Sequence, residues 1–290
     1  MSCINVLICQ LAVTQKKDHL REWVELSEVE EQIQRVWSIM DETAANLVVF
    51  PETCYFPELS NVYAERSESA VIIAGSAYNE KGLNETHIYQ NGNHRVIRKI
   101  FPSPVEVMEL NYPNDRQPDL VIKEWEKNIQ NGKWSDYFID LPGGRKAVVL
   151  TCMDYYRLGY YIANSSIISP HLWGMIAPSS NGKQDIFLRL TAAIHDLNEK
   201  VYSIVINSRN NSRPSGWDQG GSYVYGPITG NVKSKMVDIG QTDSHVSAIY
   251  TLGDGAQALS MSLIPGEDVT FFARSKDFLS NPTNIREFNL

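Results

Sequence analysis

Short and continuously apolar segments recur along this chain, and several of them end at a polar or reactive residue. The segments LVVF, AVIIAG and AVVL are rich in β-branched residues and have no alternating polar positions. Such runs are typical of strands buried on both faces. Amphipathic stretches, the first at residues 18–44, separate these runs and predict helices that cover the sheets. The predicted fold class is therefore mixed α/β.

Later segments extend this pattern. Residues 87–100 predict an antiparallel hairpin, because the Asn91-Gly92 dipeptide suits the positive φ angles of a tight turn. Helices are expected at residues 157–168 and 183–200, and a strand meander is expected at residues 220–252. No Gly/Ser/Pro-rich linker divides the chain. We therefore expect a single domain over residues 1–290, with a core at about 1–252 and a polar C-terminal tail at 253–290.

Charge and composition exclude several function classes. The 26 Lys and Arg against 34 Asp and Glu give a net charge of −8, which makes nucleic acid an unlikely partner. No segment approaches the roughly 20 apolar residues of a membrane span, and the start MSCINVLICQ lacks the features of a signal peptide. We therefore expect a cytoplasmic protein with no membrane contact. The scattered histidines and cysteines, together with the missing nucleotide-binding glycine motifs, predict no metal and no cofactor.

Three ionisable or nucleophilic residues follow apolar strands, where open α/β sheets form their binding crevices. Glu52 ends LVVFPE, Lys99 lies in HRVIRKIFP, and Cys152 ends AVVLTC. Singly they could be a solvated carboxylate, a surface cation and a small core residue. Together they supply what amide or nitrile chemistry needs, which is a thiol nucleophile, a carboxylate that moves its proton, and an ammonium that stabilises the developing oxyanion.

The chain resembles the carbon–nitrogen hydrolase (nitrilase) superfamily. FPE, RK and CMD occur in the family's order with intervals of 47 and 53 residues, and the similarity extends to Gln10, VIRKIFPSPVE, Pro178-Ser179, VYSIVINS and GGSYVYGPITGNV. The resemblance implies a four-layer αββα sandwich of the nitrilase type. It also implies an amidase-type hydrolase that cleaves a non-peptide C–N bond through a cysteine thioester, with nitrile hydrolysis as the alternative.

The resemblance further implies individual roles. Glu52 corresponds to the general base, Cys152 to the nucleophile, and Lys99 with the backbone N–H of Met153 to the oxyanion site. Glu106 matches the family's second glutamate, and Glu109 is the alternative.

Some positions depart from the family pattern. Arg157 stands one place later than the family's arginine after the nucleophile, and residues His195 to Glu199 lack the usual Arg and Glu-Asn pair. The segments after Glu52 and before Cys152 also differ in length, so the substrate does not carry over. A catalytically idle assembly or binding module is a competing interpretation, and a redox thiol using Cys54 is another.

The resemblance also implies an oligomer. Members dimerise through the helix after the nucleophile, so we expect a homodimer or larger homo-oligomer that acts on a small-molecule amide. The candidate contacts are Leu158, Tyr161, Ile162 and Ile168, unless these residues pack on their own sheet.

Overall fold

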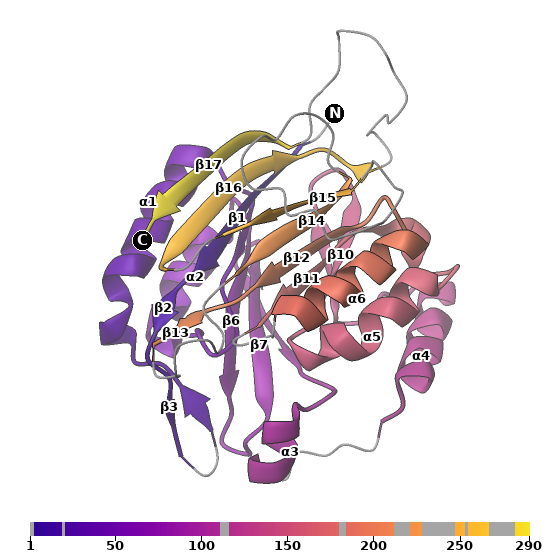
Figure 1. Ribbon diagram of the computed structural model, residues 1–290, viewed down its shortest axis with the longest axis horizontal. Helices are drawn as coiled ribbons and strands as arrows, with labels where there is room; N and C mark the ends of the chain where they lie inside the picture. Colours follow the sequence, from indigo (N-terminus) through magenta and orange to yellow (C-terminus); the bar gives the residue numbers. More distant parts are fainter. Residues whose placement is uncertain are drawn as a thin grey trace, which may run out of the picture.

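The computed structural model describes residues 3–18, 21–110, 116–179, 184–211, 221–227, 247–252, 255–266 and 282–290. Within these ranges two β-sheets lie face to face (Figure 1). The first sheet has seven strands in the order β17 (Thr283–Asn289), β16 (Gln257–Leu263), β1 (Ile4–Gln10), β5 (Leu47–Val49), β6 (Val71–Tyr78), β7 (Asn84–Gln90) and β8 (Asn93–Arg98).

The second sheet has six strands in the order β15 (Ser247–Thr251), β14 (Tyr223–Pro227), β12 (Tyr202–Ile206), β11 (Leu172–Pro178), β10 (Arg145–Val149) and β9 (Phe138–Leu141). Two short pairs accompany the main sheets, namely β2 (Ala12–Val13) with β13 (Arg209–Asn210), and β3 (Lys16–Lys17) with β4 (Glu22–Trp23). The α-helices are α1 (Glu30–Thr43), α2 (Ser60–Arg66), α3 (Pro104–Leu110), α4 (Pro118–Gln130), α5 (Met153–Asn164) and α6 (Gln184–Leu197).

Strand β1 shows why the layers form. Successive side chains of a strand point to opposite faces, so an uninterrupted apolar run buries both. Ile4, Val6 and Ile8 pack between the two sheets, whereas Leu7 and Cys9 pack with α1 on the outer face. Helices α4, α5 and α6 cover the outer face of the second sheet in the same way (Figure 1). The predicted four-layer αββα sandwich is confirmed.

Several predicted elements are present with their expected partners. Strands β5 and β6 pair in parallel, as do β10, β11 and β12, which fits their continuously apolar sequences. The hairpin of β7 and β8 turns at Asn91 and Gly92, with φ angles of 52° and 71°. The predicted meander is described in part, since β14 and β15 pair and residues 228–246 lie outside the described ranges.

Other expectations differ from the structure. The first amphipathic stretch is helical only from Glu30, and the residues before it form β3, β4 and a 3-10 turn at Leu26–Glu28. The expected helix at 157–168 begins earlier, directly after Cys152, and ends at Asn164. Residues 110–135, for which the expectations above name no element, contain the 13-residue helix α4.

The segment predicted as a C-terminal tail contributes strands to the first sheet. β16 pairs with β1 along its whole length, and β17 pairs with β16. The expected boundary at residue 252 therefore does not separate core from tail. The physical reason is that β16 buries an alternating sequence, LSMSL, whose apolar side chains enter the core.

Candidate active site

Cys152 stands at the turn between β10 and α5. Its backbone has φ 47° and ψ −104°, a conformation that residues other than glycine rarely adopt. The backbone N–H of Cys152 donates to Pro178 O at 2.9 Å, which ties the turn to the end of β11. The side chain is partly exposed. This geometry places a thiol at the N-terminus of a 12-residue helix, whose first backbone N–H groups, including that of Met153, have no acceptor within the helix.

Glu52 stands on a second strained turn, three residues after the end of β5. The next residue, Thr53, has φ 62°, and its N–H donates to the hydroxyl of Ser76 at 3.2 Å. The backbone N–H of Glu52 donates to Ser179 O at 3.3 Å. Pro178 and Ser179 therefore bind the backbones of both Cys152 and Glu52, and they hold together two turns that belong to different sheets.

Lys99 follows β8 directly, and its side chain is 2% exposed. Its ammonium nitrogen donates to Glu52 Oε1 at 2.9 Å and to Glu106 Oε1 and Oε2 at 3.0 and 2.8 Å. Two of the three bonds go to the two oxygens of one carboxylate, that of Glu106. The structure thus brings Glu52, Lys99 and Glu106 into one buried cluster.

Glu106 is held at the start of α3. Its backbone N–H donates to Ser103 Oγ at 3.2 Å, and the N–H of Ser103 donates to Glu106 Oε2 at 2.5 Å. This reciprocal pair is a capping box, which the sequence Ser-x-x-Glu encodes. The hydroxyl of Tyr78 donates to Glu106 Oε1 at 3.0 Å. Glu109, the alternative considered from sequence, also belongs to α3, but its side chain lies outside the described residues.

The charges of the cluster set the protonation states. Burial raises the pKa of the Cys152 thiol, the carboxylates of Glu52 and Glu106 raise it further, and Lys99 opposes them. Burial lowers the pKa of Lys99, but the two carboxylates outweigh it and hold that pKa well above its usual value. Burial raises the pKa of Glu106, yet Lys99 and the hydrogen bonds leave it lowered. The resting site therefore holds a neutral thiol beside an ammonium ion.

Sequence reasoning assigned no role to two residues of this network, although Asp154 belongs to the CMD motif. Asn84, fully buried at the start of β7, donates to Glu52 Oε1 at 2.8 Å and to Glu106 Oε1 at 3.3 Å. Asp154, two residues after Cys152, accepts hydrogen bonds from the backbone that follows Lys99. The sequence signal for both is a polar residue inside an otherwise buried segment.

Three other positions that the sequence analysis named make different contacts. Arg157 places its guanidinium 5.8 Å from the ring centroid of Phe101, and His195 is buried against Tyr225. Cys54 is fully buried, unlike the partly exposed Cys152, so its thiol is shielded from oxidants and from other thiols. These properties disfavour the interpretation of Cys54 as a redox partner.

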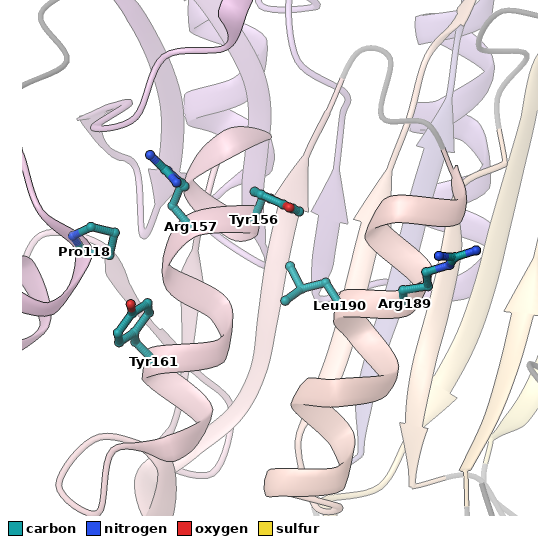
Figure 2. Close-up of a pocket in the computed structure, with 6 residues that line it drawn as sticks. All are labelled: Pro118, Tyr156, Arg157, Tyr161, Arg189 and Leu190. Atoms are coloured by element: carbon teal, nitrogen blue, oxygen red, sulfur yellow. The ribbon is translucent and has the colours of Figure 1, made fainter. Parts of the chain in front are cut away.

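Two hollows of the described surface lie elsewhere. The larger, about 540 Å³, is lined by Pro118, Tyr156, Arg157, Tyr161, Arg189 and Leu190 on α4, α5 and α6. Figure 2 shows that Tyr156 points toward Leu190, whereas the two guanidinium groups point away from each other. A second hollow of about 340 Å³ is lined by residues 195–200. Neither contains Cys152, so the charged cluster, and not these hollows, defines the candidate site.

Among the described residues, no group of three or more His, Cys, Asp or Glu side chains could hold a metal ion. None of the described helices is both long and apolar enough to cross a membrane.

No protein-family profile matches the sequence, and no curated protein sequence matches it. Solved structures do resemble it. Nit3 of Saccharomyces cerevisiae, a member of branch 10 of the nitrilase superfamily, is 18% identical, with 91% of this chain and 90% of that chain covered at a TM-score of 0.55.

An amidase from Nesterenkonia sp. AN1 is 15% identical, with 92% of each chain covered and a TM-score of 0.55. That structure is a mutant whose active-site cysteine carries the acetamide moiety of fluoroacetamide. The NitFhit protein of C. elegans is 12% identical at a TM-score of 0.54, with 87% of this chain and 61% of that chain covered.

Likeness at these identities concerns the backbone and its topology. The two face-to-face sheets, the helices on both outer faces and these structural neighbours together lead to one conclusion. The chain has the fold of the carbon–nitrogen hydrolase (nitrilase) superfamily.

Proposed function

We propose that this protein hydrolyses a small-molecule amide, releasing ammonia or an amine, through a thioester on Cys152. The observation that carries the proposal is the buried Lys99 ammonium, bound by Glu52 and Glu106 and acting on the pKa of the Cys152 thiol. Burying three ionised groups costs free energy unless they pair closely, and strongly perturbed clusters of this kind concentrate at functional sites. The carbon–nitrogen hydrolases among the structural neighbours support the same reaction class.

In the acylation step, Glu52 takes the thiol proton as Cys152 Sγ bonds to the amide carbon. A preformed thiolate is not required, which suits a thiol whose pKa is raised. The carbonyl electron pair moves to oxygen and then returns to expel nitrogen. The proton held by Glu52 passes to the departing amine, so the C–N bond breaks and a thioester remains.

Lys99 and the backbone N–H of Met153 stabilise the oxyanion of the tetrahedral intermediate. The ammonium binds both oxygens of Glu106, and opening one of these two bonds would free a proton for the substrate oxygen. The second bond to Glu106 can persist meanwhile. Glu106 is therefore a positioning residue that keeps Lys99 charged and oriented.

In the deacylation step, Glu52 removes a proton from water while the water oxygen attacks the thioester carbon. The sulfur leaves and recovers the proton from Glu52, which restores the thiol. The products are a carboxylic acid and an amine. Nitrile hydrolysis would use the same groups, with nitrogen in place of the carbonyl oxygen.

Mass spectrometry of the protein incubated with panels of small amides and nitriles tests the proposal. We expect an acyl adduct on Cys152 that turns over, and we expect Cys152→Ala and Cys152→Ser to lose all but a few per cent of the activity. A hydroxyl has a much higher pKa than a thiol and is not readily activated by a carboxylate. The proposal is wrong if either variant keeps substantial activity, or if an adduct forms on Cys3 and not on Cys152.

A further inference from the structure

We propose that Asp154 is a positioning residue that fixes Lys99 relative to Cys152 by binding the backbone that follows the lysine. The inference rests on the proposed function only in taking Lys99 and Cys152 as the reacting pair.

Asp154 is fully buried in the first turn of α5, two residues beyond Cys152. Its carboxylate does not bind its own helix. Instead, Oδ1 accepts from the N–H groups of Ile100 and Phe101 at 3.0 and 2.6 Å, and Oδ2 accepts from that of Ile100 at 2.9 Å. Both donors follow Lys99 immediately in the chain. The carboxylate therefore joins the helix of the nucleophile to the loop of the lysine.

The backbone of Lys99 is held on its other side as well. Its own N–H donates to Asn84 O at 3.0 Å, which continues the pairing of β7 with β8. Asp154 thus supplies the second attachment, on the side where the chain leaves the sheet. Without it, residues 100–103 would connect β8 to α3 with two buried N–H groups unpaired.

Only an ionised carboxyl group makes all three bonds, because Oδ1 accepts from both N–H groups and Oδ2 accepts a second bond from Ile100. Protonation would place an O–H against one of the two N–H groups, and an amide side chain would place an NH₂ there. The charged groups that face Asp154 are Lys99 and Glu106, while Arg157 lies over the Phe101 ring. Burial raises the pKa of Asp154 to about 7, although the two N–H donors and Lys99 oppose it. The attachment therefore weakens as the pH falls below about 7.

Two alkylating probes separate the position of Lys99 from the reactivity of the thiol. With acrylamide, Sγ bonds to the β-carbon, the π electrons move to the carbonyl oxygen, and the α-carbon then takes the proton that left the thiol. The oxygen becomes negative and needs Lys99. With iodoacetamide, Sγ displaces iodide and no charge develops on oxygen. The ratio of the two rates at Cys152 therefore reports on Lys99.

The experiment measures this ratio by mass spectrometry between pH 5.5 and 8.5 for the full chain, Asp154→Asn and Asp140→Asn. Asp140 is an exposed acid on β9, paired with Lys146, and serves as the matched control. For the wild type and the control, we expect the ratio of the acrylamide rate to the iodoacetamide rate to fall below about pH 7. We expect Asp154→Asn to have a ratio at least about tenfold lower at pH 8 and little dependence on pH.

Hydrogen exchange at the Ile100 and Phe101 amides provides a readout that needs no reaction. We expect Asp154→Asn to lose about tenfold or more of the protection there, and the wild type to lose protection in acid after correction for intrinsic exchange rates. If Asp154→Asn does not fold, the rate ratio and the amide protection of the wild type across the pH series test the proposal without the variant. Unchanged protection together with an unchanged ratio would overturn the proposal.

The two proposals can fail separately. If wild-type Cys152 reacts with neither probe faster than Cys3 does, the proposed hydrolase function is contradicted. The role of Asp154 is then judged on exchange at Ile100 and Phe101, where unchanged protection in Asp154→Asn or across the pH series rejects it.

Discussion

Lys99 is a buried cation whose charge depends on two carboxylates. Glu106→Gln keeps the shape and one acceptor but removes a negative charge beside the ammonium. We expect kcat/KM for the best amide substrate to fall about 100-fold, which corresponds to the roughly 1.5–3 kcal/mol of a hydrogen bond to a charged group. Steady-state kinetics with a circular dichroism check on folding would measure this.

The matched control is Tyr78→Phe, which removes only the hydroxyl that donates to Glu106. In this variant kcat/KM should fall about tenfold or less, as expected for the removal of one neutral donor. Equal activity of Glu106→Gln and the wild type would remove Glu106 from the site.

The buried ring of His195 makes the stability of the protein depend on pH. Its ring is 3% exposed, its two nitrogens have no hydrogen-bond partner within the described residues, and burial lowers its pKa to about 4 against the small opposing effect of Asp196. An unfolded chain therefore binds this proton more readily, and the stabilising contribution declines as the pH falls from about 6.5 to 4.

The limiting slope for one such group is about 1.4 kcal/mol per pH unit. Urea unfolding of the wild type and His195→Leu at pH 4.5, 5.5 and 7 would test this expectation. The unfolding free energy of His195→Leu relative to the wild type should rise as the pH falls. A difference in unfolding free energy that does not change with pH would contradict the lowered pKa of His195.

At the residue scale, the sequence identified the groups that follow strands. Glu52 and Lys99 follow strands of the first sheet and Cys152 follows a strand of the second, so the position of each at a strand end could be predicted. The attachment of Asp154 to Ile100 could not, because it joins residues 54 positions apart and depends on how a helix and a loop meet. Asn84 was missed for the same reason.

Among the elements, β6 determines where the Glu52 turn lies. Gly75 has φ +84°, and a Cβ built there would lie 2.3 Å from Pro51 O, adjacent to Glu52. We expect Gly75→Ala to cost more than about 3 kcal/mol of unfolding free energy, because both the backbone angle and the contact are forbidden. Chemical denaturation would measure this.

Gly92 offers the matched control in the hairpin turn. Its φ is +71°, but nothing lies within 4 Å of an added Cβ. Gly92→Ala should therefore cost only the strain of the angle, about 1–2 kcal/mol. Similar losses of unfolding free energy in Gly75→Ala and Gly92→Ala would show that the close approach to Pro51 is unimportant.

Helix boundaries were the least predictable part of the elements. The apolar spacing at residues 20–29 fits a helix, yet these residues form β4 and a 3-10 turn where they are described. Short irregular segments can present apolar residues at the same intervals, so spacing alone does not separate the two. The start of α5 was predicted too late because the strained angles of Cys152 turn the chain at once.

For the whole molecule, the outer face of α5 predicts self-association. Leu158, Ile162 and Ile168 are buried within their own protomer, so these three expected contacts are excluded. Tyr156, Tyr160 and Tyr161 remain 42%, 45% and 43% exposed. Light scattering should give about twice the 32.8 kDa of one chain.

Tyr160→Glu combined with Tyr161→Glu should shift the mass to that of a monomer, because a dimer face buries such tyrosines and would not accommodate two charges. Leu120→Glu, at a 58% exposed position of α4, is the control and should leave the mass unchanged. A wild-type monomer at micromolar concentration would contradict the prediction.

The sandwich as a whole could be predicted from its apolar strands, but the addition of the C-terminal strands to the first sheet could not. Strands β16 and β17 are partly polar; β16 pairs with the first strand of the chain, and β17 pairs with β16. Register between such distant segments depends on which edge remains open once the other strands have paired.

The pairing of β1 with β16 also determines when this protein can finish folding. Ser262 donates to Asn5 across 257 residues, so one edge of β1 has no partner until the end of synthesis approaches. At a synthesis rate of roughly 5–20 residues per second, that edge stays unpaired for about ten seconds to a minute. During this interval the nascent chain carries an open, apolar strand edge that can pair with other chains. Holding this edge apart from other nascent chains would therefore protect the yield of folded protein.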